Sequence, residues 1–317
     1  MAKLSLFSLL LLSVYAVKES SQALNLAEVE CGHPKAPFVR IKNGVDALVG
    51  EFPWHVALHI ADANNSNFTI YTCVGAIIHK RFVLTAAHCV QSWKADDLVA
   101  VFGSHSQSKP SKFERRVQVE NVIVHPSYLI TGSQVYNDIA LLELTEDITW
   151  NRLVLPVCLP DEEDGDHDSR DDLDSDPLVG RPVIVAGWGM TDEIKEGGEL
   201  ADSLQKVELE VLPLTKCREW IQESLGRYYP LRETQLCAGF EEGLKDACTG
   251  DSGGPLLLRN EENQLVAIGV VSTGFGCGRP RQPGLYTRVS KFLDWIIDTI
   301  EDSGHYVHNR VSEESDR

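Results

Sequence analysis

The residue with the clearest chemical potential is a serine among glycines, Ser252 in the segment Gly-Asp-Ser-Gly-Gly-Pro. A serine hydroxyl becomes an effective nucleophile when a neighbouring base removes its proton. The adjacent glycines let the backbone turn tightly and let a substrate approach closely. The N–H groups of Gly250 and Ser252 could then point at one spot and stabilise a developing oxyanion. Taken alone, a glycine-rich turn is more often simply a turn.

Two other residues could supply the base and its support. His88 stands in Thr-Ala-Ala-His-Cys, where a disulfide through Cys89 would hold the imidazole still. A lone histidine is usually structural. Asp138 opens the apolar run Ile-Ala-Leu-Leu, so it is either a solvated edge residue or a buried carboxylate. Buried against an imidazole, a carboxylate selects the tautomer and stabilises the imidazolium.

These three segments, in the chain order His88, Asp138, Ser252, resemble the chymotrypsin-trypsin family of serine peptidases. The resemblance runs from residue 41 to about residue 300 and implies that the three residues are catalytic, with Gly250 completing the oxyanion hole. It also implies an all-β fold of two antiparallel six-stranded β-barrels with a C-terminal helix. The triad would lie in the cleft between the barrels.

The resemblance also identifies residues for substrate choice. Asp246 lies six positions before Ser252, where trypsin-like members carry the carboxylate at the base of the primary pocket. Such a carboxylate pairs with a long cationic side chain, Lys or Arg. Gly274 and Gly284 match the small residues of the pocket walls, and Ser272 matches the residue that supports the triad. Ala247 supplies no hydroxyl for an ammonium, which by analogy favours Arg over Lys.

One residue of the cleft departs from the family pattern. The family usually carries Ser-Trp-Gly here, whereas this chain has Ser-Thr-Gly with Thr273 at the centre. The change removes an aromatic surface that packs against upstream substrate residues. We therefore expect a weak apolar preference upstream of the cleaved bond.

The resemblance implies activation by cleavage. The bond between Arg40 and Ile41 matches the family's activation junction, although the following Lys-Asn-Gly departs from the usual Val-Gly-Gly. The freed amino group of Ile41 would insert beside Asp251 and form a buried ion pair. Because the junction follows an arginine, another trypsin-like peptidase or the enzyme itself could cleave it.

The chain has eight cysteines, which allow 105 complete pairings. No zinc-binding spacing accompanies them. The resemblance selects four pairs and places Val183 and Leu258 where many members carry a further disulfide. The implied pairs are Cys31–Cys158, Cys73–Cys89, Cys217–Cys237 and Cys248–Cys277.

The chain divides into four segments. Residues 1–23 combine Lys3 with a leucine-rich run and small residues, which indicates a signal peptide cleaved after Ala16 or Ala23. Residues 24–40 would form a propeptide that Cys31 tethers to the catalytic domain. The catalytic domain would span residues 41–301, and residues 302–317 a flexible tail.

Short β-branched runs separated by turn residues support the all-β expectation. Helical patterns occur in two places. The expected strands are residues 54–60, 74–78, 98–102, 117–124, 139–144, 182–186, 204–211, 255–258 and 265–272, and the expected helices are 214–225 and 291–300.

Charge bears on partners. The net charge is −18, and residues 161–176 alone carry ten acids against one arginine, as expected of a solvated loop. Such acidity argues against a nucleic-acid partner, and no apolar run is long enough to predict a membrane span. Asn64 and Asn67 begin two consecutive glycosylation sequons in a polar region. In the loop after Gly103 only Glu114 matches the acids that bind calcium in some relatives, so we expect no metal.

Together these features predict a secreted zymogen of an arginine-directed endopeptidase that acts by limited proteolysis in an extracellular cascade. No cofactor is expected. Its partners would be protein substrates, an activating peptidase upstream or itself, and a protein inhibitor. Two alternatives stay open. One is a digestive-type trypsin, and the other is a catalytically impaired homologue that serves as a binding or adaptor protein.

Overall fold

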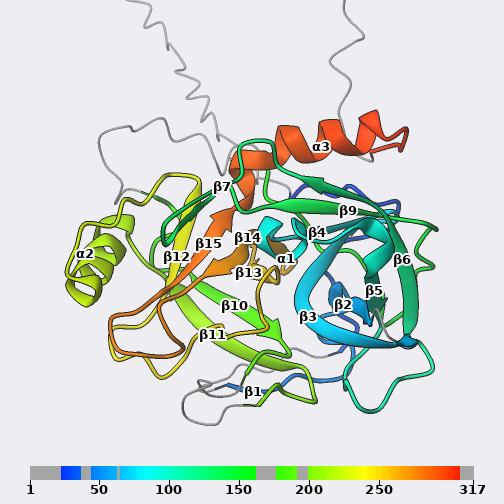
Figure 1. The fold of residues 1–317 in the computed structure, drawn as a ribbon, viewed down its shortest axis with the longest axis horizontal. Coiled ribbons are helices and arrows are strands. Elements are labelled where there is room, and N and C mark those ends of the chain that lie inside the picture. The colour runs from blue at the N-terminus through cyan, green and yellow to red at the C-terminus, as the bar shows by residue number, and fades with distance from the viewer. Residues whose placement is uncertain (1–22, 37–43, 63–64, 162–175, 191–198, 308–317) are drawn as a thin grey trace, which may run out of the picture.

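The computed structural model describes residues 23–36, 44–62, 65–161, 176–190 and 199–307 (Figure 1). The signal peptide up to residue 22, the junction residues Arg40 and Ile41, the acceptor Asn64 and most of the acidic segment therefore lie outside the described residues. The backbone of Asn67 lies in a strand, but its glycosylation stays a prediction.

Six antiparallel strands close into the first barrel in the order β2-β3-β4-β9-β6-β5. The strands are β2 (His55–Asp62), β3 (Asn65–His79), β4 (Phe82–Thr85), β5 (Leu98–Phe102), β6 (Arg115–Val124) and β9 (Ala140–Leu144). Closure gives every strand two neighbours and leaves no edge exposed.

The second barrel has the order β11-β10-β13-β14-β15-β12 and closes through pairing of β11 with β12. Its strands are β10 (Pro182–Gly187), β11 (Gln205–Val211), β12 (Gln235–Gly239), β13 (Pro255–Arg259), β14 (Leu265–Thr273) and β15 (Gly284–Arg288). The short strand β1 (Val45–Asp46) adds to the outer side of β11. The prediction of two six-stranded antiparallel barrels is confirmed.

In the described residues, three α-helices, two short 3-10 helices (Ala95–Asp97 and Val289–Phe292) and one small hairpin accompany the barrels. The α-helices are α1 (Ala87–Val90), α2 (Leu214–Leu225) and α3 (Leu293–Asp302), and the hairpin pairs β7 (Leu129–Thr131) with β8 (Gln134–Tyr136). Helix α3 buries Leu293, Ile296, Ile297 and Ile300, the spacing of an amphipathic helix. In Figure 1, α1 lies between the two barrels, whereas α2 and α3 lie at the periphery. None of the helices in the described ranges has the length and apolar character that a membrane crossing requires.

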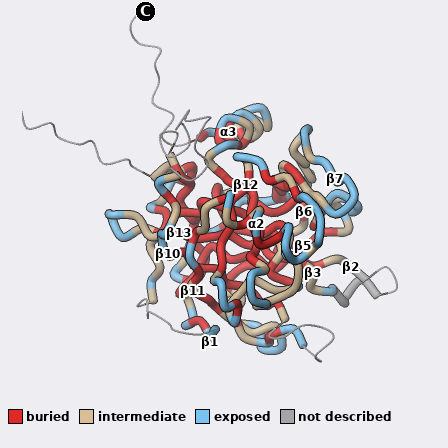
Figure 2. Tube along the Cα trace, turned by 90° about the vertical axis from the view of Figure 1, so that its left-hand side faces the viewer, coloured by how far each residue is buried: buried red, intermediate tan, exposed pale blue. Residues whose placement is uncertain are grey.

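The buried residues fill the interior of the molecule, as the red tube in Figure 2 shows, and most of them are apolar. Trp54 and Phe82 in the first barrel are fully buried, and Leu256 and Val183 fill the second. Val183 and Leu258 face each other across β10 and β13, so apolar contact occupies the position where the resemblance placed an absent disulfide. All four implied disulfides are present.

The segments flanking the barrels also pack against them. In the propeptide region, Leu24 exchanges backbone hydrogen bonds with Leu159, and Leu26 is buried. At the other end, residues 303–307 were assigned to a flexible tail, but Val307 is buried and His305 Nε2 lies 3.0 Å from Glu143 Oε1. Apolar burial therefore extends the packed domain beyond Asp302, and residues 308–317 lie outside the described range.

Candidate active site

A histidine and a buried carboxylate meet between the barrels. The Nδ1–H of His88 donates to Asp138 Oδ2 at 2.7 Å, and the backbone N–H of His88 donates to Oδ1 at 2.9 Å. Ser272 Oγ, from β14, donates to the same Oδ2 at 2.6 Å. Asp138 is only 1% exposed. With Nδ1 donating to this carboxylate, Nε2 of the neutral ring is left as an acceptor, which is the form a general base requires.

Local structure fixes the position of the histidine. Strand β4 ends at Thr85, and α1 begins two residues later, so His88 lies in the first turn after a buried strand. The Cys73–Cys89 disulfide ties α1 to β3. Because both sulfurs are bonded to each other, the cluster of Cys73, Cys89 and His88 is not a set of metal ligands.

Ser252 lies in a tight turn beside this segment. The Gly254 N–H donates to Asp251 O at 3.0 Å, and Ser252 O accepts from Val74 N at 2.8 Å. At Gly253, with φ +80°, a side chain would collide with Thr85 next to the histidine segment. Among the described residues, no hydrogen bond joins Ser252 Oγ to Nε2 of His88. Of the two contacts that link a triad, the one between His88 and Asp138 is thus formed, and the one between Ser252 and His88 is open, as is common in unliganded hydrolases.

The backbone around Ser252 provides two N–H donors without an acceptor among the described residues. Gly250 adopts φ +103°, and the carbonyl before it, on Thr249, accepts from Met190 N at 2.8 Å. Within the described part of the chain, neither Gly250 N–H nor Ser252 N–H has an acceptor. Two such free N–H groups flanking a nucleophile are what an oxyanion hole consists of.

The residues predicted for substrate choice share one pocket of about 170 Å³ with Ser252. Asp246, Ser272, Gly274 and Gly284 all line it. A Cβ on Gly284 would lie 3.1 Å from Asp246 Oδ1, and a Cβ on Gly274 would lie 3.4 Å from Gly276 O. Glycine at position 284 therefore keeps the space beside the carboxylate open, whereas a small side chain at 274 would make an ordinary contact.

Comparison with known proteins agrees with this geometry. The family model described as Trypsin matches residues 41–296. The chain belongs to the trypsin family. The chain is 35% identical to Transmembrane protease serine 9 of Rattus norvegicus over 86% of its length, 32% to Serine proteinase stubble of Drosophila melanogaster over 88%, and 33% to Phenoloxidase-activating factor 1 of Holotrichia diomphalia over 86%. The alignments cover 23%, 34% and 72% of those proteins, so the first two relatives are much longer.

The primary pocket of this trypsin-family chain has an unsatisfied carboxylate at its base. Burial raises the pKa of Asp246 to about 7. Its Oδ2 accepts from Gly278 N at 3.3 Å, whereas Oδ1 is buried without a partner among the described residues. The hydroxyl of Tyr286, which also lines the pocket, is likewise buried and unpaired. A planar cation with several N–H donors would satisfy these acceptors.

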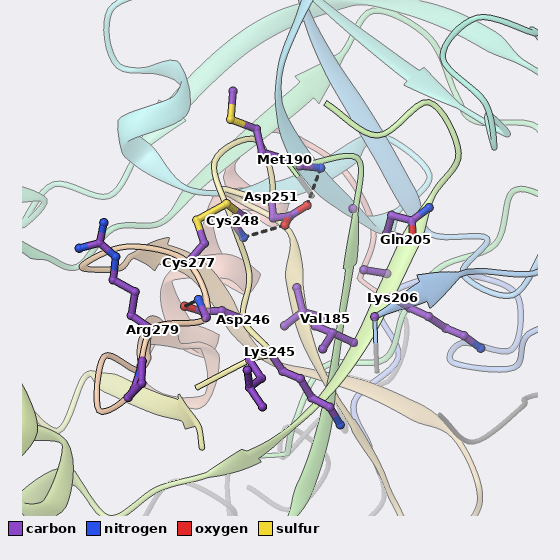
Figure 3. A pocket seen from close by; sticks show the side chains of 18 residues that line it. Val185, Met190, Gln205, Lys206, Lys245, Asp246, Cys248, Asp251, Cys277 and Arg279 are labelled. Carbon is purple, nitrogen blue, oxygen red and sulfur yellow. Dashed lines mark hydrogen bonds between the residues drawn. A yellow bond between two sulfur atoms is a disulfide. The ribbon is translucent and has the colours of Figure 1, made fainter. Parts of the chain in front are cut away.

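Asp251 points into a second, larger cavity of about 560 Å³ (Figure 3). Its carboxylate accepts from Gly189 N at 2.8 Å and from Cys248 N at 2.9 Å. Burial raises the pKa of Asp251 to about 6 despite these two bonds. Gly44, the first described residue after the junction, lines the same cavity. The predicted activation residues Arg40 and Ile41 lie outside the described residues, so their contact with Asp251 stays a prediction.

Sequence reasoning missed two features of the site. Tyr286 lies in the pocket, but its sequence surroundings resemble any buried strand of an antiparallel barrel. Gly187 and Gly189 flank the Asp251 carboxylate so closely that a Cβ on either would collide with it. Their Gly-Trp-Gly pattern was a usable signal, because two glycines around a buried aromatic indicate a close approach of another group.

Proposed function

We propose that the protein is a secreted serine endopeptidase that cleaves peptide bonds after arginine, and less readily after lysine. The observation that supports this most directly is the pocket in which Asp246, with an unpaired carboxylate oxygen, lies at the base and Ser252 lines the same space. A substrate arginine that pairs with Asp246 would bring the bond after it to the serine hydroxyl. Ala247, which has no hydroxyl for an ammonium, supports the preference for arginine.

In the proposed mechanism, Ser252 Oγ attacks the scissile carbonyl while His88 Nε2 takes its proton. Asp138, already bonded to Nδ1, stabilises the imidazolium that forms. The carbonyl oxygen becomes negative and accepts hydrogen bonds from the N–H groups of Gly250 and Ser252. His88 then gives the proton to the leaving amine. In the second half of the reaction, water attacks the acyl group while His88 takes a proton from it, and His88 then returns this proton to Ser252 Oγ as the acid product leaves.

The chain is made as a zymogen in this proposal. Cleavage after Arg40 would free the amino group of Ile41, and Gly44 and Asp251 line the same cavity. Three extended residues span about 10 Å, the reach that the Ile41 amino group would have from Gly44. A buried carboxyl with a raised pKa gains from a cationic partner. The resulting ion pair, whose disruption costs roughly 3 to 5 kcal/mol, would hold the turn that carries Gly250 and Ser252.

Limited proteolysis is favoured over digestion. The Cys31–Cys158 disulfide retains the propeptide after cleavage, which suits a regulated peptidase that keeps its light chain. One relative is named as an activating factor for phenoloxidase, and we extend a role of that kind, the activation of another protein, to this chain. Export, glycosylation at Asn64 or Asn67, an activating peptidase and a protein inhibitor belong to the same proposal. An adaptor role is disfavoured because His88, Asp138 and Ser252 are all retained.

The test is to express the chain, cleave it after Arg40 and assay arginyl, lysyl and aromatic chromogenic peptides beside a Ser252→Ala control. We expect the order arginyl, lysyl, aromatic, and no turnover by the control. Processed protein that leaves arginyl peptides intact, or a control as active as the parent, would refute the proposed activity.

A further inference from the structure

A tyrosine of the first barrel reaches the turn that carries the nucleophile in the second. Tyr71, in β3, donates its hydroxyl to the Gly250 carbonyl at 2.5 Å, across 179 positions of sequence. No role in the triad or in the primary pocket requires this residue. It nevertheless bonds directly to the residue whose N–H is free for an oxyanion.

The ring of Tyr71 is held in place by its neighbours. It contacts Trp188 edge to face with centroids 6.2 Å apart, and His59 in the same way at 6.0 Å. A Cβ on Gly250 would lie 3.5 Å from the tyrosine ring. Burial raises the pKa of Tyr71 well above its usual value of 10, so the hydroxyl keeps its proton and remains a donor at neutral pH.

The bond completes the anchoring of the turn. The Thr249 carbonyl is held by Met190 N at 2.8 Å, and the Asp251 N–H is held by Cys248 O at 2.9 Å. Between them lies Gly250, a glycine at φ +103° with wide conformational freedom. The Tyr71 hydroxyl holds the carbonyl of the peptide after Gly250, and Met190 N holds the carbonyl of the peptide before it, which carries the Gly250 N–H. With both peptides held, rotation at Gly250 is restricted, and within the described residues its N–H stays free of a protein acceptor, as does that of Ser252.

We propose that Tyr71 is a positioning residue for the oxyanion hole: its hydroxyl bond to the Gly250 carbonyl keeps the Gly250 N–H aimed at the oxygen that becomes negative. This inference rests on the proposed peptidase function. A preorganised N–H donor stabilises the negative oxygen of the transition state, whereas the binding of a cation at Asp246 does not involve this donor. Loss of the Tyr71 hydroxyl should therefore slow turnover and spare binding in the primary pocket.

The experiment compares Tyr71→Phe with Tyr229→Phe in chain cleaved after Arg40. Tyr229 is the matched control because its buried hydroxyl also donates to a backbone carbonyl, that of Ser133 at 3.2 Å. Each variant is assayed with a short arginyl substrate, a peptide arginine aldehyde and benzamidine. The aldehyde binds as a hemiacetal: Ser252 Oγ bonds to the carbonyl carbon, its proton passes to His88 Nε2, and the electron pair of the broken carbonyl π bond leaves the negative charge on the oxygen. Benzamidine occupies the primary pocket alone.

For Tyr71→Phe we expect kcat to fall roughly tenfold and aldehyde affinity to fall in parallel, the effect of one buried hydrogen bond. KM and the benzamidine inhibition constant should stay within about twofold, and Tyr229→Phe should match the parent. Equal losses for aldehyde and benzamidine would overturn the proposal, because they indicate general damage to the fold. Unchanged kcat and aldehyde affinity would overturn it as well. An inactive parent enzyme would instead refute the proposed function.

Discussion

The specificity of the pocket gives the sharpest prediction. Asp246→Asn removes one charge from the base of the pocket and preserves its shape. In the complex, the carboxylate pairs with a buried guanidinium, and breaking such a pair costs roughly 3 to 5 kcal/mol. At about 1.4 kcal/mol per factor of ten, kcat/KM for an arginyl substrate should fall by about two to four orders of magnitude.

The assay compares kcat/KM for an arginyl and a leucyl substrate that are otherwise identical. Asp96→Asn, which changes an exposed acid in the short 3-10 helix Ala95–Asp97, is the matched control and should behave like the parent. The leucyl rate should change little in Asp246→Asn, because that substrate forms no ion pair. An arginyl loss smaller than tenfold, or an equal loss in the control, would refute the role assigned to Asp246.

The same carboxyl predicts a pH dependence. Because burial raises the pKa of Asp246 to about 7 in the empty pocket, benzamidine must compete with a proton below that pH. Its affinity should be flat above pH 7 and fall about tenfold per pH unit below it, and Asp246→Asn should show no such slope. The folded pKa lies above the unfolded one, so this group's contribution to stability is lost as pH rises. Asp246→Asn should therefore gain thermal stability at pH 8 but not at pH 4.

Three further substitutions follow from the geometry. Ser272→Ala removes the 2.6 Å bond to the triad carboxylate and should lower kcat roughly tenfold with little change in KM, as steady-state kinetics will measure. Gly284→Val places a side chain about 3 Å from the pocket carboxylate and from the buried Tyr286 hydroxyl, so it should abolish benzamidine binding and also lower the melting temperature; retained binding would contradict the pocket assignment. Lys206→Met should lower the free energy of unfolding, measured with denaturant, by roughly 3 to 5 kcal/mol, because it removes the cationic partner of the buried Glu51 carboxylate. The double variant Glu51→Met with Lys206→Met should recover most of that loss.

Much of the barrel architecture could be predicted from the sequence, but three core strands could not. The run at 98–102 matches β5, and the helix at 214–225 matches α2, because each has a strong period and clear ends. Strands β4, β12 and β15 were not predicted. They are four or five residues long, and β12 and β15 each carry a glycine, so their strand character comes from the neighbours that they pair with.

Some residues of the site could also be predicted from the sequence, and others could not. Asp138 and Ser252 were recognisable because their segments have strong local patterns. Tyr71 was not, since nothing near it in the sequence points to a partner 179 positions away. Only closure of both barrels brings that hydroxyl to the Gly250 carbonyl. Contacts that depend on tertiary pairing in this way leave no local signal.

The identity of the nucleophile is tested most directly by a reagent that phosphorylates an activated serine. After cleavage at Arg40, diisopropyl fluorophosphate should modify the protein once, and peptide mapping by mass spectrometry should place the adduct on Ser252. Benzamidine should slow the labelling, and His88→Ala should prevent it, because the hydroxyl then has no base. An adduct on a different serine, or labelling of Ser252 at full rate in His88→Ala, would contradict the central claim.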